Sequence, residues 1–284
     1  MSATPDRNAT PPGTAVIVGL GRSGVSTARH LVGRGWQVAV TDSRAEPPGV
    51  PGLREFAPRA ALRCGGFDAE LLDGATLVVA SPGVSLAEPI FARARELGLE
   101  VVGDIELFAR ATRGIPTLGI TGTNGKSTVT TLVGRMATRA GRQVRVGGNL
   151  GPPALELLEQ AGAVDLYVLE LSSFQLETTR SLQLAAGAIL NLTPDHMDRY
   201  ADLAAYGAAK ARILARCDVA VINADDPAVA AMPRPGQAQR RFTLREGVDA
   251  EYSVALRAGE GWLLRGEQAL LPLSRMRLAG LHNA

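Results

Sequence analysis

Short apolar runs alternate with amphipathic segments along the first part of the chain. Each run ends in a glycine, a serine or an aspartate, a pattern typical of buried strands in a parallel sheet. The predicted strands are AVIVG (15–19), QVAVTD (37–42), ATLVVASPG (75–83) and EVVGD (100–104). Helical spacing separates them, at 25–35 and 88–98. Alternating strands and helices predict an α/β domain with a doubly wound, mainly parallel sheet.

A second series of the same kind opens at IPTLGIT (115–121). It continues as a helix (128–141), two strands (165–171 and 185–193), a helix (201–217) and a strand with its loop (218–227). After about residue 240 the pattern changes to short strands with turns, which predicts a small antiparallel patch on the second domain. We therefore predict a disordered tail at 1–13, a first domain at 14–103 and a second at 104–284.

The composition narrows the function classes. Hydrophobic residues make up 46% and charged residues 20%, as in a soluble globular protein, and the formal net charge is only +2. That charge argues against a nucleic-acid or membrane surface. The isolated cysteines Cys64 and Cys217 suit a reducing cytoplasm. The polar N-terminus lacks the apolar core of a secretory signal, and no stretch is apolar enough to span a bilayer.

Lysine is almost absent, although basic residues are common. Lysine and arginine together number 30, and only Lys126 and Lys210 are lysines. Arginine serves wherever a solvated positive charge suffices. A retained lysine therefore points to a need for a compact ammonium, or for an amine that can lose its proton.

The sequence GLGRSG follows the first predicted strand and precedes a helix. Gly19, Gly21 and Gly24 give the spacing G-x-G-x-x-G, and Asp42 ends the next strand. This matches a dinucleotide fingerprint with the acid on a ribose. The glycines themselves only let the backbone approach a phosphate at a helix N-terminus. From these residues alone the loop could hold NAD(P) or FAD, hold another nucleotide, or be a tight turn.

The sequence TGTNGKST follows a buried strand and starts a helix. It departs from the common G-x-x-x-x-G-K-[ST] spacing, because Ile120 stands where the first glycine belongs. Gly122 and Gly125 still free backbone N–H groups for phosphate oxygens. Lys126 can reach the β- and γ-phosphates, and Ser127 can offer its hydroxyl to Mg²⁺. The alternative is a glycine turn with a helix cap.

Two acidic or histidine-containing strand ends lie in the second series. Glu170 ends an apolar strand, where a partner for Mg²⁺ is expected near a phosphate loop. It could also be an ordinary exposed strand end. His196 stands between Asp195 and Asp198 just after another strand. That setting leaves a structural histidine and a metal or acid–base role equally open.

Lys210 falls on the apolar face of the helix predicted over 201–217. It lies four residues after Tyr206 and three before Ile213, so the three side chains share one face. An inward lysine either snorkels to solvent or is a desolvated amine with a chemical role. Burial lowers the pKa of a lysine. A neutral amine can add CO₂ and become an anionic carbamate that binds metal.

Taken together, several motifs resemble the Mur ligases. They are GTNGKSTVTTLV, GGNLGPPAL, YVLELSSFQLETT, NLTPDHMDRY, AAKARIL, VINADD and LAGLHN, with SPGVSLAEP and VGDIELF in the first domain. The resemblance covers nearly the whole chain from about residue 14. The family's ATP loop reads G-[TS]-N-G-K-[ST], so the resemblance explains the unusual spacing as a variant phosphate loop.

The resemblance implies a role for each loop. The Rossmann-like first domain would hold the UDP part of a substrate, displacing the dinucleotide interpretation. The implied UDP-substrate residues are Gly19, Leu20, Arg22, Ser23, Asp42, Ser43, Arg44, Ser81, Gly83 and Asn149. The implied ATP residues are Gly122, Thr123, Asn124, Gly125, Lys126, Ser127, Thr128, Val129, His282 and Asn283. The implied catalytic residues are Lys126, Glu170, His196 and Lys210, and the Mg²⁺ ligands are Ser127, Glu170, His196 and carbamylated Lys210.

The resemblance also implies an activity. It is the ATP-dependent ligation of D-glutamate to UDP-N-acetylmuramoyl-L-alanine through an acyl phosphate, in peptidoglycan synthesis and thus in cell shape and division. ATP and Mg²⁺ would be the cofactors, and the protein a cytoplasmic monomer. The family's third domain, which binds the amino acid, has no counterpart here, so residues 1–284 alone are expected to bind without turnover. A fragment that only binds, or an oxidoreductase suggested by GLGRSG alone, are the rival interpretations.

Overall fold

The computed structural model describes residues 13–112 and 114–276. These residues form two compact units that interleave along the chain. The first unit contains the N-terminal part through Gly114 together with the segments Gly147–Ala163 and Phe174–Leu182. The second contains Ile115–Val146, Val164–Ser173 and the chain from Gln183 onward. Two excursions from the second series therefore pack with the first unit.

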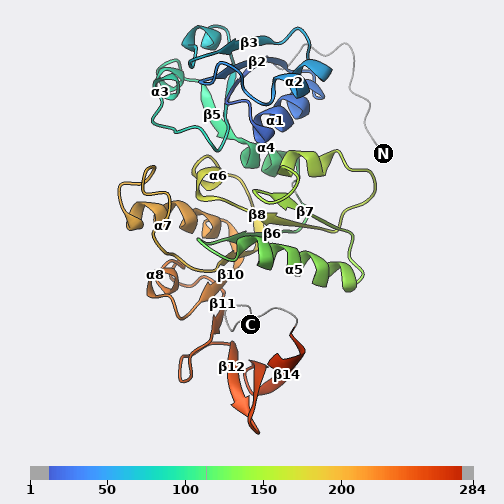
Figure 1. Cartoon of the computed structure of the whole chain (residues 1–284), viewed down its shortest axis with the longest axis vertical. Helices are drawn as coiled ribbons and strands as arrows, with labels where there is room; N and C mark the ends of the chain where they lie inside the picture. The colour runs from blue at the N-terminus through green and yellow to red at the C-terminus, as the bar shows by residue number, and fades with distance from the viewer. Residues whose placement is uncertain (1–12, 113, 277–284) are drawn as a thin grey trace. The chain divides into compact units, whose positions relative to one another are not determined.

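The first unit is built on a five-stranded sheet in the order β3-β2-β1-β4-β5. All four pairings are parallel, as the alternating pattern predicted. The elements are β1 (Thr14–Val18), α1 (Arg22–Val32), β2 (Gln37–Asp42), α2 (Val50–Phe56), β3 (Ala61–Cys64), a 3₁₀ turn (Ala69–Leu72), β4 (Leu77–Ala80), α3 (Pro89–Glu96), β5 (Glu100–Gly103) and α4 (Asp104–Ala111) (Figure 1).

The burial of the strands explains which of them the sequence revealed. Residues 15–18 of the central strand β1 are all 0% exposed, because helices cover both faces of a doubly wound sheet. The edge strand β3 is mostly exposed and carries no apolar alternation, so the hydrophobic pattern did not indicate it. The order of the strands reverses between β1 and β4, where the carboxyl ends leave a crevice suited to a ligand.

The second unit is built on a nine-stranded sheet in the order β14-β13-β12-β11-β10-β9-β6-β8-β7. Its elements are β6 (Thr117–Thr121), α5 (Lys126–Arg139), β7 (Val144–Gly148), a 3₁₀ turn (Ala154–Leu158), β8 (Leu166–Glu170), α6 (Ser173–Glu177), β9 (Leu184–Ile189), α7 (Leu203–Ala211), a 3₁₀ turn (Arg212–Leu214), β10 (Cys217–Asn223), α8 (Pro227–Ala230), β11 (Gln239–Thr243), β12 (Tyr252–Arg257), β13 (Glu260–Arg265), β14 (Gln268–Pro272) and a 3₁₀ turn (Leu273–Arg275).

The predicted antiparallel patch is present. Strand β12 pairs antiparallel with β13, and β13 antiparallel with β14; β12 and β14 are labelled at the orange-to-red end of the chain in Figure 1. The patch continues the main sheet, because β11 pairs parallel with both β10 and β12. Within the described residues, no helix has the length and apolar character needed to cross a bilayer.

One helix is much shorter than its prediction. The helix expected over 201–217 ends at Ala211, and a 3₁₀ turn follows before β10 begins at Cys217. The predicted length was wrong because the alternating run from Cys217 onward belongs to a strand, which pairs with β9 in register. Lys210 still lies within the helix, next to its last residue.

Candidate functional sites

The loop after β6 has the geometry of a phosphate cradle. Gly122 and Gly125 adopt φ of 154° and 80°, values that side-chain-bearing residues rarely adopt. The helix α5 then starts at Lys126 without a side-chain cap, and its first backbone N–H groups have no partner within the helix. The Lys126 ammonium donates to the carbonyls of Gly122 (3.0 Å) and Thr123 (2.8 Å). A lysine held by the carbonyls of such a loop can turn its ammonium group toward an anion that binds there.

Asn191 fastens this loop from the neighbouring strand, and the sequence analysis missed it. It lies two residues beyond β9. Its Oδ1 accepts from the backbone N–H groups of Thr123 (3.0 Å) and Asn124 (2.8 Å), and its Nδ2 donates to the carbonyl of Asn124. The parallel pairing of β6 with β9 brings the two segments together. The asparagine that opens NLTPDH was the available signal, but nothing local connects it to the loop.

Ser127 and Glu170 meet at the start of α5. The Ser127 hydroxyl donates to Glu170 Oε2 at 2.7 Å, although the residues are far apart in sequence. Glu170 ends β8, is 2% exposed and lies opposite Ile120 in the register with β6. Hydroxyl and carboxylate oxygens are ligands that suit Mg²⁺, which usually binds one or two protein oxygens together with phosphates and water. The pair fits such an ion.

Lys210 reaches the same loop from α7. The side chain is 1% exposed, and its Nζ donates to the Gly122 carbonyl at 2.8 Å, the oxygen that Lys126 also contacts. The Nζ lies 4.4 Å from the centre of the Tyr206 ring. Burial, and secondarily the charge of Lys126, lowers the pKa of Lys210 to about 7, while Asp195 opposes the shift. A neutral amine is therefore accessible near neutral pH.

His196 lies in the loop between β9 and α7. Its backbone has φ of 54°, which is rare for a residue with a side chain. Its Nε2 is 3.6 Å from Asp195 Oδ2, and its ring contacts the Tyr206 ring edge-on at 6.1 Å. Within 13–112 and 114–276, no three or more His, Cys, Asp or Glu side chains cluster so as to hold a metal ion. A metal role for His196 stays a prediction.

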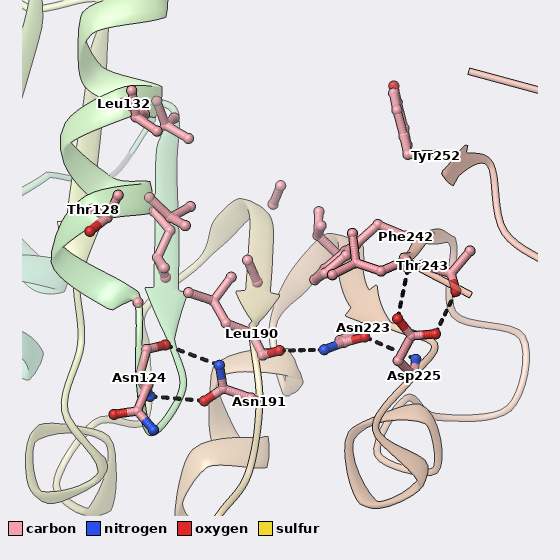
Figure 2. A pocket seen from close by; sticks show the side chains of 18 of the residues that line it. Asn124, Thr128, Leu132, Leu190, Asn191, Asn223, Asp225, Phe242, Thr243 and Tyr252 are labelled. Carbon is pink, nitrogen blue, oxygen red and sulfur yellow. Dashed lines mark hydrogen bonds between the residues drawn. The ribbon is translucent and has the colours of Figure 1, made fainter. Parts of the chain in front are cut away.

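An apolar pocket of about 610 Å³ opens beside the phosphate loop. The predicted ATP residues Asn124, Gly125, Thr128 and Val129 contribute to its lining. A polar edge follows one side in Figure 2, where Asn124 faces Asn191 and Asn223 donates to the Leu190 carbonyl. The predicted ATP residues His282 and Asn283 lie outside the described residues.

A second pocket, of about 470 Å³, lies in the first unit. The loops after β1, β2 and β4 line it, at the reversal of strand order. Eight of the predicted UDP-substrate residues line this pocket: Gly19, Arg22, Ser23, Asp42, Ser43, Arg44, Ser81 and Gly83. Gly21 and Gly24 of the GLGRSG motif also line it, and so do Phe67, Pro82 and Val84, which the sequence did not indicate. The predicted Leu20 is instead fully buried, and Asn149 is not among the lining residues.

Asp42 is engaged with its own loop. Its carboxylate accepts from Arg44 Nε (2.9 Å) and Nη2 (2.7 Å) and from the backbone N–H of Leu20 (2.6 Å). Burial opposes its ionisation, but these hydrogen bonds outweigh it and lower the pKa of Asp42 to about 2. The carboxylate therefore stays ionised and holds Arg44 at the rim of the pocket.

Two mainly parallel sheets, with a glycine loop between the first strand of each unit and the helix that follows it, define this chain as an α/β protein. The profile of the Mur ligase MurD-like N-terminal domain matches residues 13–103, and that of the Mur ligase middle domain matches residues 120–283. The chain belongs to the Mur ligase family.

The names of similar curated proteins are consistent with this family assignment. The UDP-N-acetylmuramoylalanine–D-glutamate ligase of Nitrosococcus oceani is 56% identical over 270 residues, covering 95% of this chain and 59% of that protein. The enzyme of that name from Methylococcus capsulatus is 48% identical over 268 residues, covering 94% of this chain and 58% of that protein. The chain therefore spans a little under three fifths of these relatives' length.

Solved structures show the same fold at low identity. The UDP-N-acetylmuramate:L-alanyl-gamma-D-glutamyl-meso-diaminopimelate ligase of Neisseria meningitides aligns with a TM-score of 0.63 at 18% identity, covering 95% of this chain and 89% of that one. The UDP-N-acetylmuramate-alanine ligase of Thermotoga maritima gives 0.58 at 20% identity, covering 95% and 62%.

Proposed function

We propose that this chain supplies the nucleotide-substrate pocket and the ATP site of a ligase that joins D-glutamate to UDP-N-acetylmuramoyl-L-alanine. The names of the curated relatives support the reaction. The observation that carries the proposal is the convergence of Lys126, Lys210 and the Ser127–Glu170 pair on one loop. The product would be a precursor of peptidoglycan. Since ATP and a UDP-linked precursor are cytoplasmic metabolites, we also propose a cytoplasmic enzyme, acting as a monomer.

The proposed reaction proceeds in two steps. The alanyl carboxylate attacks the γ-phosphorus of ATP, forming an acyl phosphate and releasing ADP. The amine of D-glutamate then attacks the acyl carbon, and the tetrahedral intermediate expels phosphate as the nitrogen loses a proton. A carboxylate is a poor electrophile, so phosphorylation supplies the leaving group. In this reaction Lys126 would stabilise charge on the transferring phosphoryl group, and the loop N–H groups would fix its position.

Mg²⁺ would be held by Ser127 and Glu170, with His196 and a carbamylated Lys210 as the further predicted ligands. When bound, the ion would neutralise phosphate charge and orient the phosphoryl group. The protein's part is to hold the buried Glu170 beside the start of α5, within hydrogen-bond distance of Ser127.

Lys210 would act as a carbamate in this proposal. Its amine nitrogen bonds to the carbon of CO₂, one proton leaves to solvent, and the product carries a negative charge. The depressed pKa supports this step, since only the neutral amine has a lone pair to donate. Arginine could not replace it, which accounts for a lysine retained in an arginine-rich chain.

Calorimetric titration of variants in each unit tests the assignment of the two ligands. Lys126→Ala and Ser127→Ala should weaken Mg·ATP binding by about tenfold or more, since each removes a charge-assisted contact. Both variants should bind UDP-N-acetylmuramoyl-L-alanine with wild-type affinity, because its proposed pocket lies in the other unit. The matched variant Ser81→Ala, at the UDP pocket, should show the reverse. Equal loss of both ligands in any single variant would contradict the proposal.

A further inference from the structure

A buried carboxylate lies directly behind the UDP pocket. Asp104 is the first residue of α4 and is 3% exposed. Its Oδ1 accepts from the N–H of Ile105 at 2.9 Å, and its Oδ2 accepts from Gln175 Nε2 at 3.2 Å. Ser23, which lines the pocket, lies close enough for its hydroxyl to lower the pKa of this carboxyl group. Asp104 thus touches the pocket wall without facing the ligand.

Among the described residues, only neutral groups act on this carboxylate. The groups that shift its pKa are the Gln175 amide, the Ser23 hydroxyl and backbone N–H groups, against the effect of burial. The charged residues on the surrounding elements have other partners. Arg22 donates to the Gly151 carbonyl, and Arg29 pairs with Glu55. Glu100 and Glu106 pair with Arg110, and neither Glu156 nor Glu177 shifts the pKa of Asp104.

Two effects oppose each other at Asp104. The N-terminus of α4 and the hydrogen-bond donors favour the anion. Burial favours the neutral acid, and it is the larger effect, so the pKa of Asp104 lies above its ordinary value. An anionic ligand in the adjacent pocket would add repulsion and favour the neutral acid further.

The protonation of Asp104 decides how Ser23 can serve a ligand. A hydroxyl has one proton and can donate it to one partner. If Asp104 is ionised, Ser23 donates to it and presents only lone pairs to the pocket, which repel a phosphate oxygen. If Asp104 is protonated, it donates to the Ser23 oxygen, and the Ser23 proton becomes free to bind the phosphate.

We propose that Asp104 is a positioning residue that takes up a proton when a nucleoside diphosphate ligand binds, and so turns the Ser23 hydroxyl toward a phosphate oxygen. The inference rests on the proposed function, because it uses the UDP pocket. It concerns a residue behind that pocket and a proton that accompanies the ligand.

Calorimetry in pairs of buffers with different ionisation heats measures that proton. The probe is UDP-N-acetylmuramoyl-L-alanine, whose diphosphate is a diester and whose carboxyl group is ionised throughout the range from about pH 5.5 to about pH 8.5. In the same unit, burial, and then the charge of Arg34, lowers the pKa of His30 to about 4, and the pKa of Asp42 is about 2, so neither titrates there. We expect uptake of up to about one proton per ligand, and an affinity that falls by up to about tenfold per pH unit as pH rises.

Three variants separate positioning from a structural role. Asp104→Asn should keep affinity within about threefold, because its amide donates to Ser23 permanently, and should lose both proton uptake and pH dependence. Ser23→Ala should bind about tenfold more weakly through loss of a charge-assisted hydrogen bond. The control Glu106→Gln changes a nearby buried carboxylate that binds Arg110 and the N–H groups of Arg180 and Ser181, and should keep the proton uptake. Thermal unfolding of each variant confirms that it is folded.

The outcomes distinguish this inference from the function on which it rests. Binding without proton uptake in the wild type, or the same uptake in Asp104→Asn, would overturn the role of Asp104 and leave the UDP pocket standing. No binding of the probe to folded wild-type protein would instead reject the proposed function, and this inference with it.

Discussion

At the scale of single residues, the lowered pKa of Lys210 predicts how the free energy of unfolding changes with pH. This pKa is about 7 in the folded protein, against about 10.4 for an unperturbed lysine. Below pH 7 the lysine is charged in both the folded and the unfolded chain, so burying its charge lowers the stability of the folded protein by the full amount. Between about pH 7 and about pH 10 the unfolded chain binds a proton that the folded protein does not, so folding becomes more favourable as pH rises.

Replacing the lysine by an apolar residue removes this dependence. In CO₂-depleted buffer, the free energy of unfolding of the wild type should rise relative to that of Lys210→Met by up to about 1.4 kcal/mol per pH unit above pH 7. Urea denaturation at a series of pH values measures the difference. The control Arg216→Met replaces an exposed arginine, and should give a flat difference. A flat difference for Lys210→Met as well would contradict the lowered pKa.

At the scale of elements, the turn from β1 to α1 depends on how closely its backbone packs. A Cβ on Gly24 would lie 2.1 Å from the carbonyl oxygen of Gly19, a contact that forces the turn to shift. A Cβ on Gly21, three residues earlier, would meet nothing within 4 Å. The two glycines share one motif but not one function: Gly24 allows the helix to pack on the strand, and Gly21 leaves the pocket open.

Alanine substitutions should therefore differ sharply within this turn. Gly24→Ala should cost about 1–3 kcal/mol of stability, the range for overpacking a rigid site. Gly21→Ala should change stability by less than about 0.5 kcal/mol, because its Cβ would meet no atom within 4 Å, while narrowing the pocket for a phosphate. Urea denaturation gives the first quantity and substrate titration the second. Equal stability of the two variants would show that the turn relaxes easily.

At the scale of the whole molecule, the ligands proposed for the two pockets set an expectation for activity. The proposed function assigns both pockets to nucleotides and neither to glutamate. The polypeptide of residues 1–284 should bind UDP-N-acetylmuramoyl-L-alanine, yet form no glutamyl product. With no amine held beside it, any acyl phosphate would react with water, because only a closed site excludes water from such an intermediate.

Mass spectrometry tests this expectation on purified 1–284 incubated with ATP, Mg²⁺, UDP-N-acetylmuramoyl-L-alanine and D-glutamate. Weak substrate-stimulated release of phosphate is compatible with it. The matched control is a full-length relative under the same conditions. Product heavier by one glutamyl residue, formed at a rate comparable to that control, would place the glutamate site within these residues.

The sequence by itself determined the parts of this protein that depend on neighbouring residues. Apolar runs predicted the parallel strands, and the glycines of GLGRSG and TGTNGKST predicted two strand–loop–helix turns, because positive φ values and helix starts are local properties. The scarcity of lysine, a property of composition alone, singled out Lys126 and Lys210. The edge strand β3 escaped, since an exposed strand carries little hydrophobic pattern.

Only the tertiary structure decided which distant residues meet. Asn191 fastens a loop 67 residues away through Asn124, and Gln175 reaches Asp104 across 71 residues. Glu170 and Ser127 meet because β8 pairs with β6 in a register that no local pattern specifies. Such contacts follow from strand order and helix packing, which depend on the burial of the whole chain. For this reason the sequence predicted the loops, and the tertiary structure determined which distant side chains contact them.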